Sequence, residues 1–508
     1  MITRTSALAG GALVVAACAS ADVANVAGTD DSASSGEGVD SSSPTAGQPA
    51  VIDPATIPRG EEIDFGPRPD VPEGPLNEEV AAAVALLYGA PITGRLDAFQ
   101  REALMTVGAS GDPRLAWLLS DHIRVYLRLA QTGGLTEDEF FENNDLLEAT
   151  AGQLTGQTFA QLQSWNPLTN ALIGWDIPEP PDYLAGKRNI YVPVEPAWQE
   201  LMDDNSVLDW RYVSWGGVLI DNRPYDTTDD QCNCIPAIDN PTTLTADEGT
   251  WVADDAVIFG VVINGEARAY PRQIMEVREM VNDTLGGRDF AMPYCTLCGS
   301  AQVWFTDDLP DGIERPVLRT SGLLSRSNKV MYDLTSGSIF DTFRGTADSG
   351  ALLTEEISLQ AHTVVTSTWA AWREEHPNTT VLTEDLALGR DPDFRNNRDA
   401  DGPIFPIGSV DPRLAIQEDI LGIIQDNGTP LAIHVNSAAG AISRGGSSRS
   451  TAFKSSVPAT VSPHSTETAT RSSAIKPSGL LGRSSTQAPN SGPTCRPATT
   501  VRPLPAAK

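Results

Sequence analysis

Two cysteines separated by two residues are the feature of this sequence whose residue types and spacing most directly permit chemistry. Cys295 and Cys298 lie in the segment Met-Pro-Tyr-Cys-Thr-Leu-Cys-Gly, residues 292–299. This spacing turns both sulfur atoms inward on a tight loop, and Gly299 relieves the backbone after the second cysteine. Such a loop serves three chemistries: a reversible disulfide, two ligands of a soft-metal site, or a static disulfide that staples the loop. The spacing alone leaves all three open.

A second cysteine pair, Cys232 and Cys234, lies upstream of the first. Four cysteines can hold zinc in a tetrahedral site, but a Cys-x-Cys followed so distantly by a Cys-x-x-Cys is weak evidence for one. A disulfide within Cys-x-Cys is expected to be strained, because disulfides join well-separated Cα atoms. We therefore expect cross-pairing between the two motifs under oxidising conditions. Cys495 lies in a segment of unusual composition and receives no role.

Other functional classes are disfavoured by motif and by charge. Ser321-Gly322 does not form a nucleophile elbow, because Thr320 precedes the serine and Leu323 follows the glycine. The sequence contains no phosphate-binding loop and no dinucleotide fingerprint. With 35 Lys and Arg against 67 Asp and Glu, its formal net charge is −32, which argues against binding to nucleic acid.

The first 18 residues are similar to a lipoprotein-type signal peptide. One cation, Arg4, precedes an apolar run over residues 7–17, which is shorter than the about 20 residues that a bilayer crossing needs. The run ends Val-Ala-Ala-Cys, which resembles a lipobox with Cys18 as the lipid attachment site. We expect an exported protein anchored by lipid to a membrane of the cell envelope, where disulfides persist. A secreted protein is the alternative.

The patterning predicts an α+β fold in which a small helical domain precedes a β-rich module. Residues 19–75 are acidic and rich in Ser, Gly, Asp and Pro, which predicts a disordered tether. Residues 76–185 have helical periodicity, and Asp112 before Pro113 is typical of a helix start. Residues 190–385 are expected to form the β-rich module.

Within that module, specific hairpins and helices are expected. Residues 257–270 form a hairpin around an Asn-Gly turn, and Pro271 opens a helix to about residue 281. Asn282 and Asp283 are expected to cap the end of that helix before the turn at Gly286 and Gly287, and a polar pair beside the cysteine site is the alternative. A further hairpin over residues 329–340 and a helix carrying Trp369 and Trp372 follow.

The end of the chain indicates a partial second repeat and then a change of composition. Residues 420–433 repeat the first hairpin, with Gly422 matching Gly260, within a partial second repeat over residues 400–436. Residues 437–508 hold nine Lys or Arg and one Glu, which predicts a disordered basic tail. We hypothesise a shift of reading frame near residue 440 that truncates the second copy of the module.

The module resembles the DUF3179 family of bacterial and archaeal proteins of unknown function. The similarity runs from about residue 210 to 382 and extends weakly to 436. It is carried by residues 235–241, 262–271, 281–287, 294–299, 320–324, 327–333 and 368–372, together with His376-Pro377. The resemblance implies a shared fold and a shared site around Cys295 and Cys298, without an established reaction.

Arg278 departs from the family pattern, which commonly has a His at this position. An Arg keeps its proton, so it cannot be an ordinary metal ligand, whereas it can stabilise a nearby thiolate. Three functions follow as hypotheses. The first is a binding module for an extracytoplasmic ligand, or for a soft metal ion held by Cys295 and Cys298. The second is a thiol–disulfide redox protein in which Arg278 assists the cysteines, and the third is a structural protein with a stapled loop.

Overall fold

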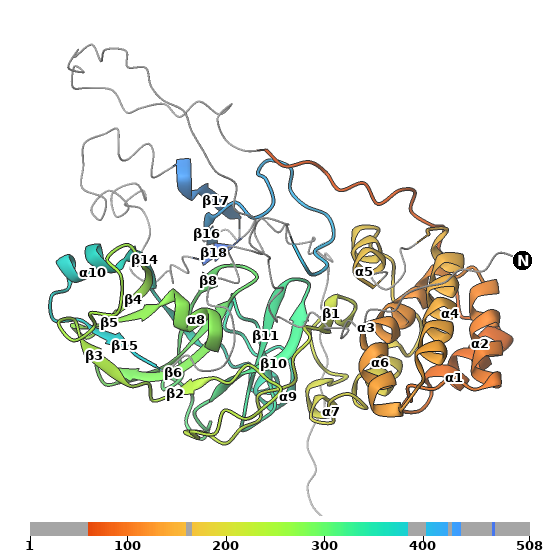
Figure 1. Cartoon of the computed structure of the whole chain (residues 1–508), viewed down its shortest axis with the longest axis horizontal. Helices are drawn as coiled ribbons and strands as arrows, with labels where there is room; N and C mark the ends of the chain where they lie inside the picture. Colours follow the sequence, from red (N-terminus) through yellow and green to blue (C-terminus); the bar gives the residue numbers. More distant parts are fainter. Residues whose placement is uncertain (1–58, 159–164, 385–402, 425–428, 438–469, 473–508) are drawn as a thin grey trace, which may run out of the picture. The chain divides into compact units, whose positions relative to one another are not determined.

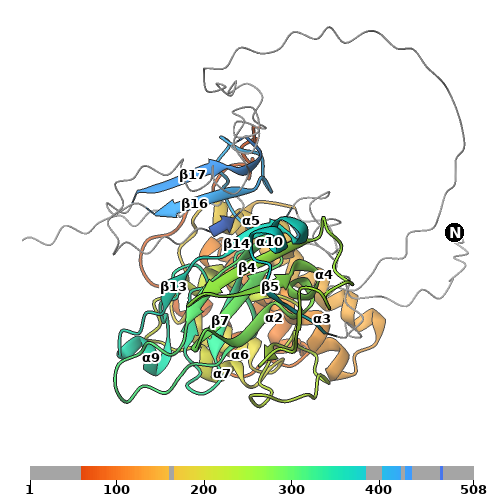
Figure 2. The same ribbon diagram turned by 90° about the vertical axis from the view of Figure 1, so that its left-hand side faces the viewer.

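The computed structural model describes residues 59–158, 165–384, 403–424, 429–437 and 470–472 of the chain. The expected signal peptide with Cys18, most of the expected tether, and most of the expected tail with Cys495 lie outside these residues. Within them, helices precede a region rich in strands, which confirms the expected α+β class (Figure 1, Figure 2). None of the helices described there combines the length and the apolar character that a membrane crossing requires.

Helices form the first part of the described chain. Capping boxes begin two of them, at Asp97 and at Thr136. Asp112 before Pro113 starts a short 3₁₀ turn that leads into α3, in agreement with the expected helix start. The helices are α1 (Glu78–Tyr88), α2 (Ala98–Ala109), α3 (Ala116–Gly133), α4 (Glu137–Thr155), α5 (Trp165–Gly174), α6 (Tyr183–Tyr191) and α7 (Trp198–Leu201). The first strand begins at Val213, so the β-rich part starts later in the chain than residue 190.

The strands pair into sheets that we call outer, central and inner. The outer sheet has the order β14 (Val365–Thr368), β4 (Val257–Ile263), β5 (Glu266–Pro271), β15 (Thr380–Leu382) and β3 (Thr243–Thr245). The central sheet has the order β13 (Gln360–His362), β9 (Val303–Phe305), β7 (Arg288–Cys295), β6 (Met280–Leu285) and β2 (Ile238–Asp239), with β8 (Ser300–Ala301) paired to β7. The inner sheet has the order β1 (Val213–Trp215), β10 (Leu318–Ser325), β11 (Asn328–Asp333) and β12 (Ile339–Phe340).

These sheets stack because alternate side chains of one strand enter different apolar layers. In β7, Phe290 and Met292 pack between the outer and central sheets, whereas Ala291 packs toward Met331 of the inner sheet. This period of two is the ordinary geometry of a strand that is buried on both faces. The other face of the inner sheet joins the core of the helical part, and α10 (Trp369–Glu375) covers the outer sheet.

Both copies of the expected hairpin are present. β4 and β5 pair with Gly260 opposite Ala269, and α8 (Arg272–Arg278) follows β5 as expected. In the second copy, β16 (Ile420–Ile424) pairs with β17 (Pro430–His434), and Gly422 lies opposite Ala432. The two registers place the matching glycines opposite an alanine in each hairpin, so the sequence repeat is also a repeat of structure. β18 (Thr470–Ser472) pairs with β16.

The expected helix cap at Asn282 and Asp283 is wrong, because both residues lie inside β6. The amide of Asn282 exchanges hydrogen bonds with the backbone of Leu318 in the inner sheet. Asp283 points to the opposite face, where its carboxylate accepts hydrogen bonds from Arg268 and Tyr270. The pair therefore joins the central sheet to both neighbouring sheets.

His122 makes the stability of the helical part sensitive to pH. Burial lowers the pKa of His122 to about 3, and its Nδ1 lies 3.2 Å from the hydroxyl of Tyr88. In the unfolded chain a His titrates near pH 6.5, so below that pH the unfolded state binds a proton that the folded state does not. The contribution is fully present above about pH 6.5 and decreases by about 1.4 kcal/mol per unit as the pH falls toward 3.

We expect urea unfolding between pH 7 and pH 4.5 to show this loss in the parent chain. A His122→Gln variant keeps a polar acceptor but has no imidazole to protonate, so its free energy of unfolding should depend less on pH. Equal pH slopes in the two proteins would contradict the assignment.

Candidate functional site

The Cys-x-x-Cys loop joins β7 to β8 at one end of the central sheet. Cys295 is the last residue of β7 and pairs with Ser300 of β8, so residues 296–299 form a tight loop. Gly299 has φ +61°, the left-handed conformation that suits glycine after the second cysteine. The amide of Cys298 donates to the carbonyl of Cys295 over 3.2 Å, which closes the turn.

This loop brings the two sulfur atoms together. The Sγ atoms of Cys295 and Cys298 are 2.7 Å apart, and both cysteines are free thiols. A disulfide bond is about 2.05 Å long, so the pair can close without rearrangement of the backbone. The expectation that the spacing places both sulfurs side by side is thus confirmed by the geometry.

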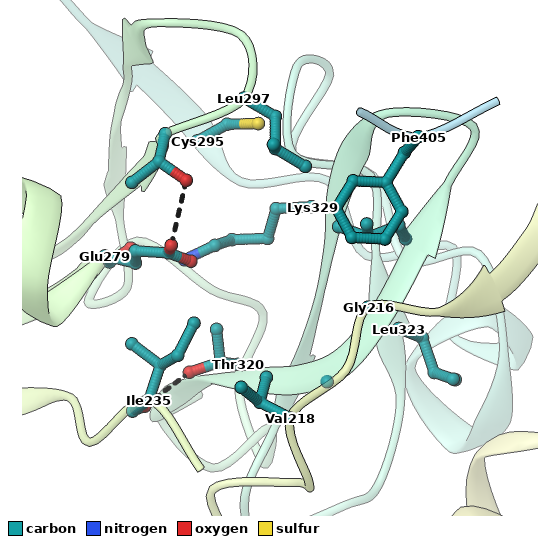
Figure 3. Close-up of a pocket in the computed structure, with 13 residues that line it drawn as sticks. Gly216, Val218, Ile235, Glu279, Cys295, Leu297, Thr320, Leu323, Lys329 and Phe405 are labelled. Carbon is teal, nitrogen blue, oxygen red and sulfur yellow. Dashed lines mark hydrogen bonds and ion pairs between the residues drawn. The ribbon is translucent and has the colours of Figure 1, made fainter. Parts of the chain in front are cut away.

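A pocket reaches Cys295 although its side chain is almost fully buried. The pocket encloses about 480 Å³, part of it open to solvent, and Cys295 lines it together with Thr296, Glu279 and Lys329. Figure 3 shows Lys329 extending toward Glu279 beneath Cys295. The remaining wall is mostly apolar and consists of Gly216, Val218, Ile235, Leu297, Thr320, Gly322, Leu323, Leu324 and Phe405. Cys298 is not among the residues that line the pocket.

Lys329 and Glu279 form a buried ion pair on the polar side of the pocket. Lys329 Nζ is 3.0 Å from Glu279 Oε2 and donates over 2.6 Å to the carbonyl of the same residue. Thr296 Oγ1 donates to Glu279 Oε1 over 3.0 Å. Glu279 ends α8 with φ +56°, a left-handed conformation in which glycine is usual. Non-glycine residues in this conformation are held by their surroundings and concentrate at functional sites.

The surroundings of Cys295 favour its thiolate. Burial raises the pKa of Cys295, and Glu279 adds a smaller rise. These effects are outweighed by the hydrogen bond with Cys298, the hydrogen bond from the backbone N–H of Lys329 and the charge of the Lys329 ammonium. The net result is a pKa of Cys295 below that of a free thiol.

Cys298 faces hydrogen-bond acceptors. Its Sγ lies 3.5 Å from the carbonyl oxygen of Ser327 and 3.5 Å from Oδ1 of Asn328. Oxygen acceptors bind an S–H group, whereas they repel a thiolate. The two cysteines are therefore not equivalent: Cys295 lines the pocket and has a lowered pKa, whereas Cys298 lies beside oxygen acceptors and does not line the pocket.

Arg278 has a different place from the one expected. It forms ion pairs with Asp230, over 2.9 Å, and with Glu384, and its described contacts do not include either sulfur of the Cys-x-x-Cys loop. Lys329 supplies the cation beside Cys295 instead. Lys329 shares a face of β11 with Met331 and Asp333, all three of them buried, and its place beside Cys295 becomes apparent only in the folded chain.

The expected cross-pairing of the two cysteine motifs is wrong. Cys232 and Cys234 form a disulfide with each other, and their Cα atoms are 5.1 Å apart. That separation lies within the range that a disulfide bridges, because the backbone around Asn233 is bent enough to bring the two side chains together. Cys234 also pairs with Leu219 in an isolated β-bridge. In the described part of the chain, no group of three or more His, Cys, Asp or Glu side chains is arranged to hold a metal ion.

Residues 232–477 match the sequence model of the family described as "Protein of unknown function (DUF3179)". Residues 232–477 are a DUF3179 module. No curated protein and no solved structure matches the chain. The DUF3179 module contains both cysteine pairs, Glu279 and Lys329, whereas the helical part and the pocket residues Gly216 and Val218 precede it.

Proposed function

We propose that the DUF3179 module is a thiol–disulfide redox module in which Cys295 attacks a substrate disulfide and Cys298 resolves the product. The observation that carries this proposal is the inequivalent pair: two free sulfurs lie 2.7 Å apart, and of the two cysteines only Cys295 lines the pocket, where the charge of Lys329 lowers its pKa. Thiolate character and access together decide the reactivity of a cysteine.

The reaction has two steps that balance. The thiolate of Cys295 attacks one sulfur of a substrate disulfide, forms a mixed disulfide and releases the other half as a thiolate. Cys298 then gives up its proton and attacks Sγ of Cys295, which forms the Cys295–Cys298 disulfide and releases the second half of the substrate. Two electrons pass from the dithiol to the substrate, and the reverse sequence oxidises a substrate dithiol.

We propose in addition that this chemistry takes place outside the cytoplasm, with the protein anchored to a membrane by lipid on Cys18. The lipobox-like end of the N-terminal apolar run and the Cys232–Cys234 disulfide support this placement, because disulfides persist in oxidising compartments.

The pH dependence of alkylation tests the redox proposal. In the reduced protein, the rate at which iodoacetamide labels Cys295 should follow a single titration with a midpoint below about 8.5, the value of a free thiol. Because the pKa of Cys295 is lowered, labelling should persist to a lower pH than that of a free thiol and decline when the pH falls through the shifted value. Peptide mass spectrometry after native labelling measures the rate at this one residue.

Two other results would overturn the proposal in favour of the remaining hypotheses. A Cys295–Cys298 disulfide that mild reductant does not open and that exchanges with no added disulfide indicates a structural staple. A metal ion that copurifies with the reduced protein, and whose removal by a chelator is needed before Cys295 is labelled, indicates a soft-metal site.

A further inference from the structure

A short segment of the chain connects the helical part to the cysteine pocket. Residues 404–408 are held on one side by α5, where Asn166 Nδ2 donates to the carbonyl of Ile404 over 2.8 Å. Asn170 Oδ1 accepts from the backbone amides of Ile407 and Gly408 over 2.9 and 2.7 Å. These contacts fix both ends of the segment against one helix.

The same segment is fixed to the turn that precedes Lys329. The guanidinium of Arg326 donates to the carbonyl of Ile407 over 3.2 Å, and Ser327 Oγ donates to the carbonyl of Phe405 over 3.4 Å. The carbonyl of Ser327 in turn lies beside both sulfurs of the cysteine pair. Residues 404–408 thus bridge α5 and the site.

Phe405 projects from this segment into the wall of the pocket. Its side chain is buried, and Figure 3 shows its ring across the pocket from Cys295. Its ring meets that of Trp165 edge to face, with centroids 6.0 Å apart. Phe405 therefore forms part of the pocket wall that faces Cys295.

Arg124 of α3 holds this aromatic group in place. Its guanidinium lies 4.1 Å from the ring centroid of Trp165, 5.3 Å from that of Trp215 and 5.5 Å from that of Phe405. Its Nε donates to the carbonyl of Trp215 over 2.7 Å, which fixes the plane of the guanidinium. A cation that contacts several aromatic rings at once restricts their motion, because each ring face attracts the positive charge.

We propose that Phe405 is a specificity-determining residue of the cysteine pocket and that Arg124 is its positioning residue. The pocket then accepts a disulfide with a narrow aliphatic half and excludes a bulky aromatic one. The helical part, which lies outside the DUF3179 module, would by this means select the substrates of the module. This inference rests on the proposed thiol–disulfide function.

Two neutral disulfides of different width test the inference. The rate of reaction of Cys295 is measured with 2-hydroxyethyl disulfide, which is narrow and aliphatic, and with 4,4′-dithiodipyridine, which is broad and aromatic. Phe405→Ala should raise the ratio of the aromatic rate to the aliphatic rate by about tenfold or more relative to the parent chain, the usual range for removing side-chain bulk from a selective pocket. Phe405→Leu should give an intermediate ratio, and it provides a second variant if Phe405→Ala folds poorly.

Arg124→Ala should shift the ratio in the same direction by a smaller factor, and Arg124→Lys should recover part of the selectivity. The midpoint of the alkylation titration of Cys295 should stay unchanged in all four variants, because neither residue contacts the sulfur atoms. Ile404→Ala, in the same segment but at a side chain that is exposed and does not line the pocket, is the matched control and should leave the ratio unchanged.

The outcomes separate this inference from the proposed function. If the parent protein reacts with neither disulfide, the redox function fails and the inference fails with it. If the parent protein reacts but Phe405→Ala leaves the ratio of the two rates unchanged, the redox function survives and the role of Phe405 is overturned. This holds whether the variant accelerates both probes equally or accelerates neither. If Ile404→Ala changes the ratio as much as Phe405→Ala does, the substitutions loosen the segment in general. That result overturns both the specificity role of Phe405 and the positioning role of Arg124.

Discussion

Replacing Cys295 by Ser is expected to abolish disulfide exchange, whereas replacing Cys298 by Ser should leave the first step intact and stop the reaction halfway. Cys295 lines the pocket and has the lowered pKa, so its loss removes the proposed attacking group. Without Cys298 the mixed disulfide has no internal thiol to resolve it and should accumulate. The rate with 2-hydroxyethyl disulfide should fall at least a hundredfold in Cys295→Ser, since a hydroxyl does not replace a thiolate as nucleophile.

Intact-mass measurement under non-reducing conditions distinguishes these outcomes, on a background in which Cys18 and Cys495 are Ser. The parent pair should lose two hydrogens and carry no adduct, Cys298→Ser should carry one half of the probe, and Cys295→Ser should remain unmodified. An adduct on Cys295→Ser but not on Cys298→Ser would reverse the two roles. Identical behaviour of the two variants would contradict the inequivalence that the geometry shows.

A variant without the Cys232–Cys234 disulfide is the matched control for this experiment. Both residues become Ser, and the exchange rate at Cys295 should change little, because that disulfide does not line the pocket. A large loss of exchange in this control would mean that the Cys-x-Cys pair takes part in the reaction.

The parts of the fold that sequence predicted are those governed by short-range geometry. The Cys-x-x-Cys loop, the Asn-Gly hairpin and α10 each depend on residues within a few positions of one another, so spacing and turn chemistry determine them. The Cys-x-Cys disulfide is also local, but the expectation of strain overlooked that a bend at Asn233 places the two Cα atoms 5.1 Å apart, within the range that a disulfide spans. At Asn282 and Asp283, a polar pair before two glycines is typical of a helix end and led to the wrong prediction. The pair instead lies in a strand that is buried on both faces, where the two side chains form hydrogen bonds to the neighbouring sheets.

The site residues that sequence reasoning missed depend on the stacking of sheets. Lys329 reaches Cys295 because β11 of the inner sheet crosses the end of β7 in the central sheet, and no local pattern encodes that crossing. The sequence pattern points to Arg278, the residue next to Glu279. At the end of the helix, Arg278 turns toward Asp230, whereas Glu279 turns toward the pocket. Phe405 comes from a segment far along the chain, and only the folded chain shows that it forms part of the wall.

Removing the charge of Lys329 should weaken both the reactivity of Cys295 and the stability of the fold. In Lys329→Met the thiolate loses an attractive charge, so the pKa of Cys295 should rise and its labelling at neutral pH should slow. The carboxylate of Glu279 remains buried, with 8% of its side chain exposed, and loses its partner. An unpaired buried charge costs about 3–5 kcal/mol, which urea unfolding should detect as a lower free energy of unfolding.

The double variant Lys329→Met with Glu279→Gln separates these two effects. It removes both charges, so most of the lost stability should return, because an amide costs less to bury than an unpaired carboxylate. The pKa of Cys295 should return to that of the parent chain or fall slightly below it, because the charge of Glu279 raises this pKa at least as much as the charge of Lys329 lowers it. If stability returns while the pKa of Cys295 stays raised, the two charges do not tune the thiol.

Glu279→Gln alone gives the strongest test, because it should move the pKa of Cys295 in the direction opposite to Lys329→Met. Glu279 raises the pKa of Cys295 by its negative charge, so its neutralisation should lower the midpoint of the alkylation titration and speed labelling at acidic pH. Both single variants break the same ion pair and should both lose stability. A structural role for the pair predicts shifts of one sign, whereas an electrostatic role predicts shifts of opposite sign. The two titration midpoints, compared with that of the parent chain, therefore decide whether Lys329 and Glu279 tune the thiolate or only support the fold around it.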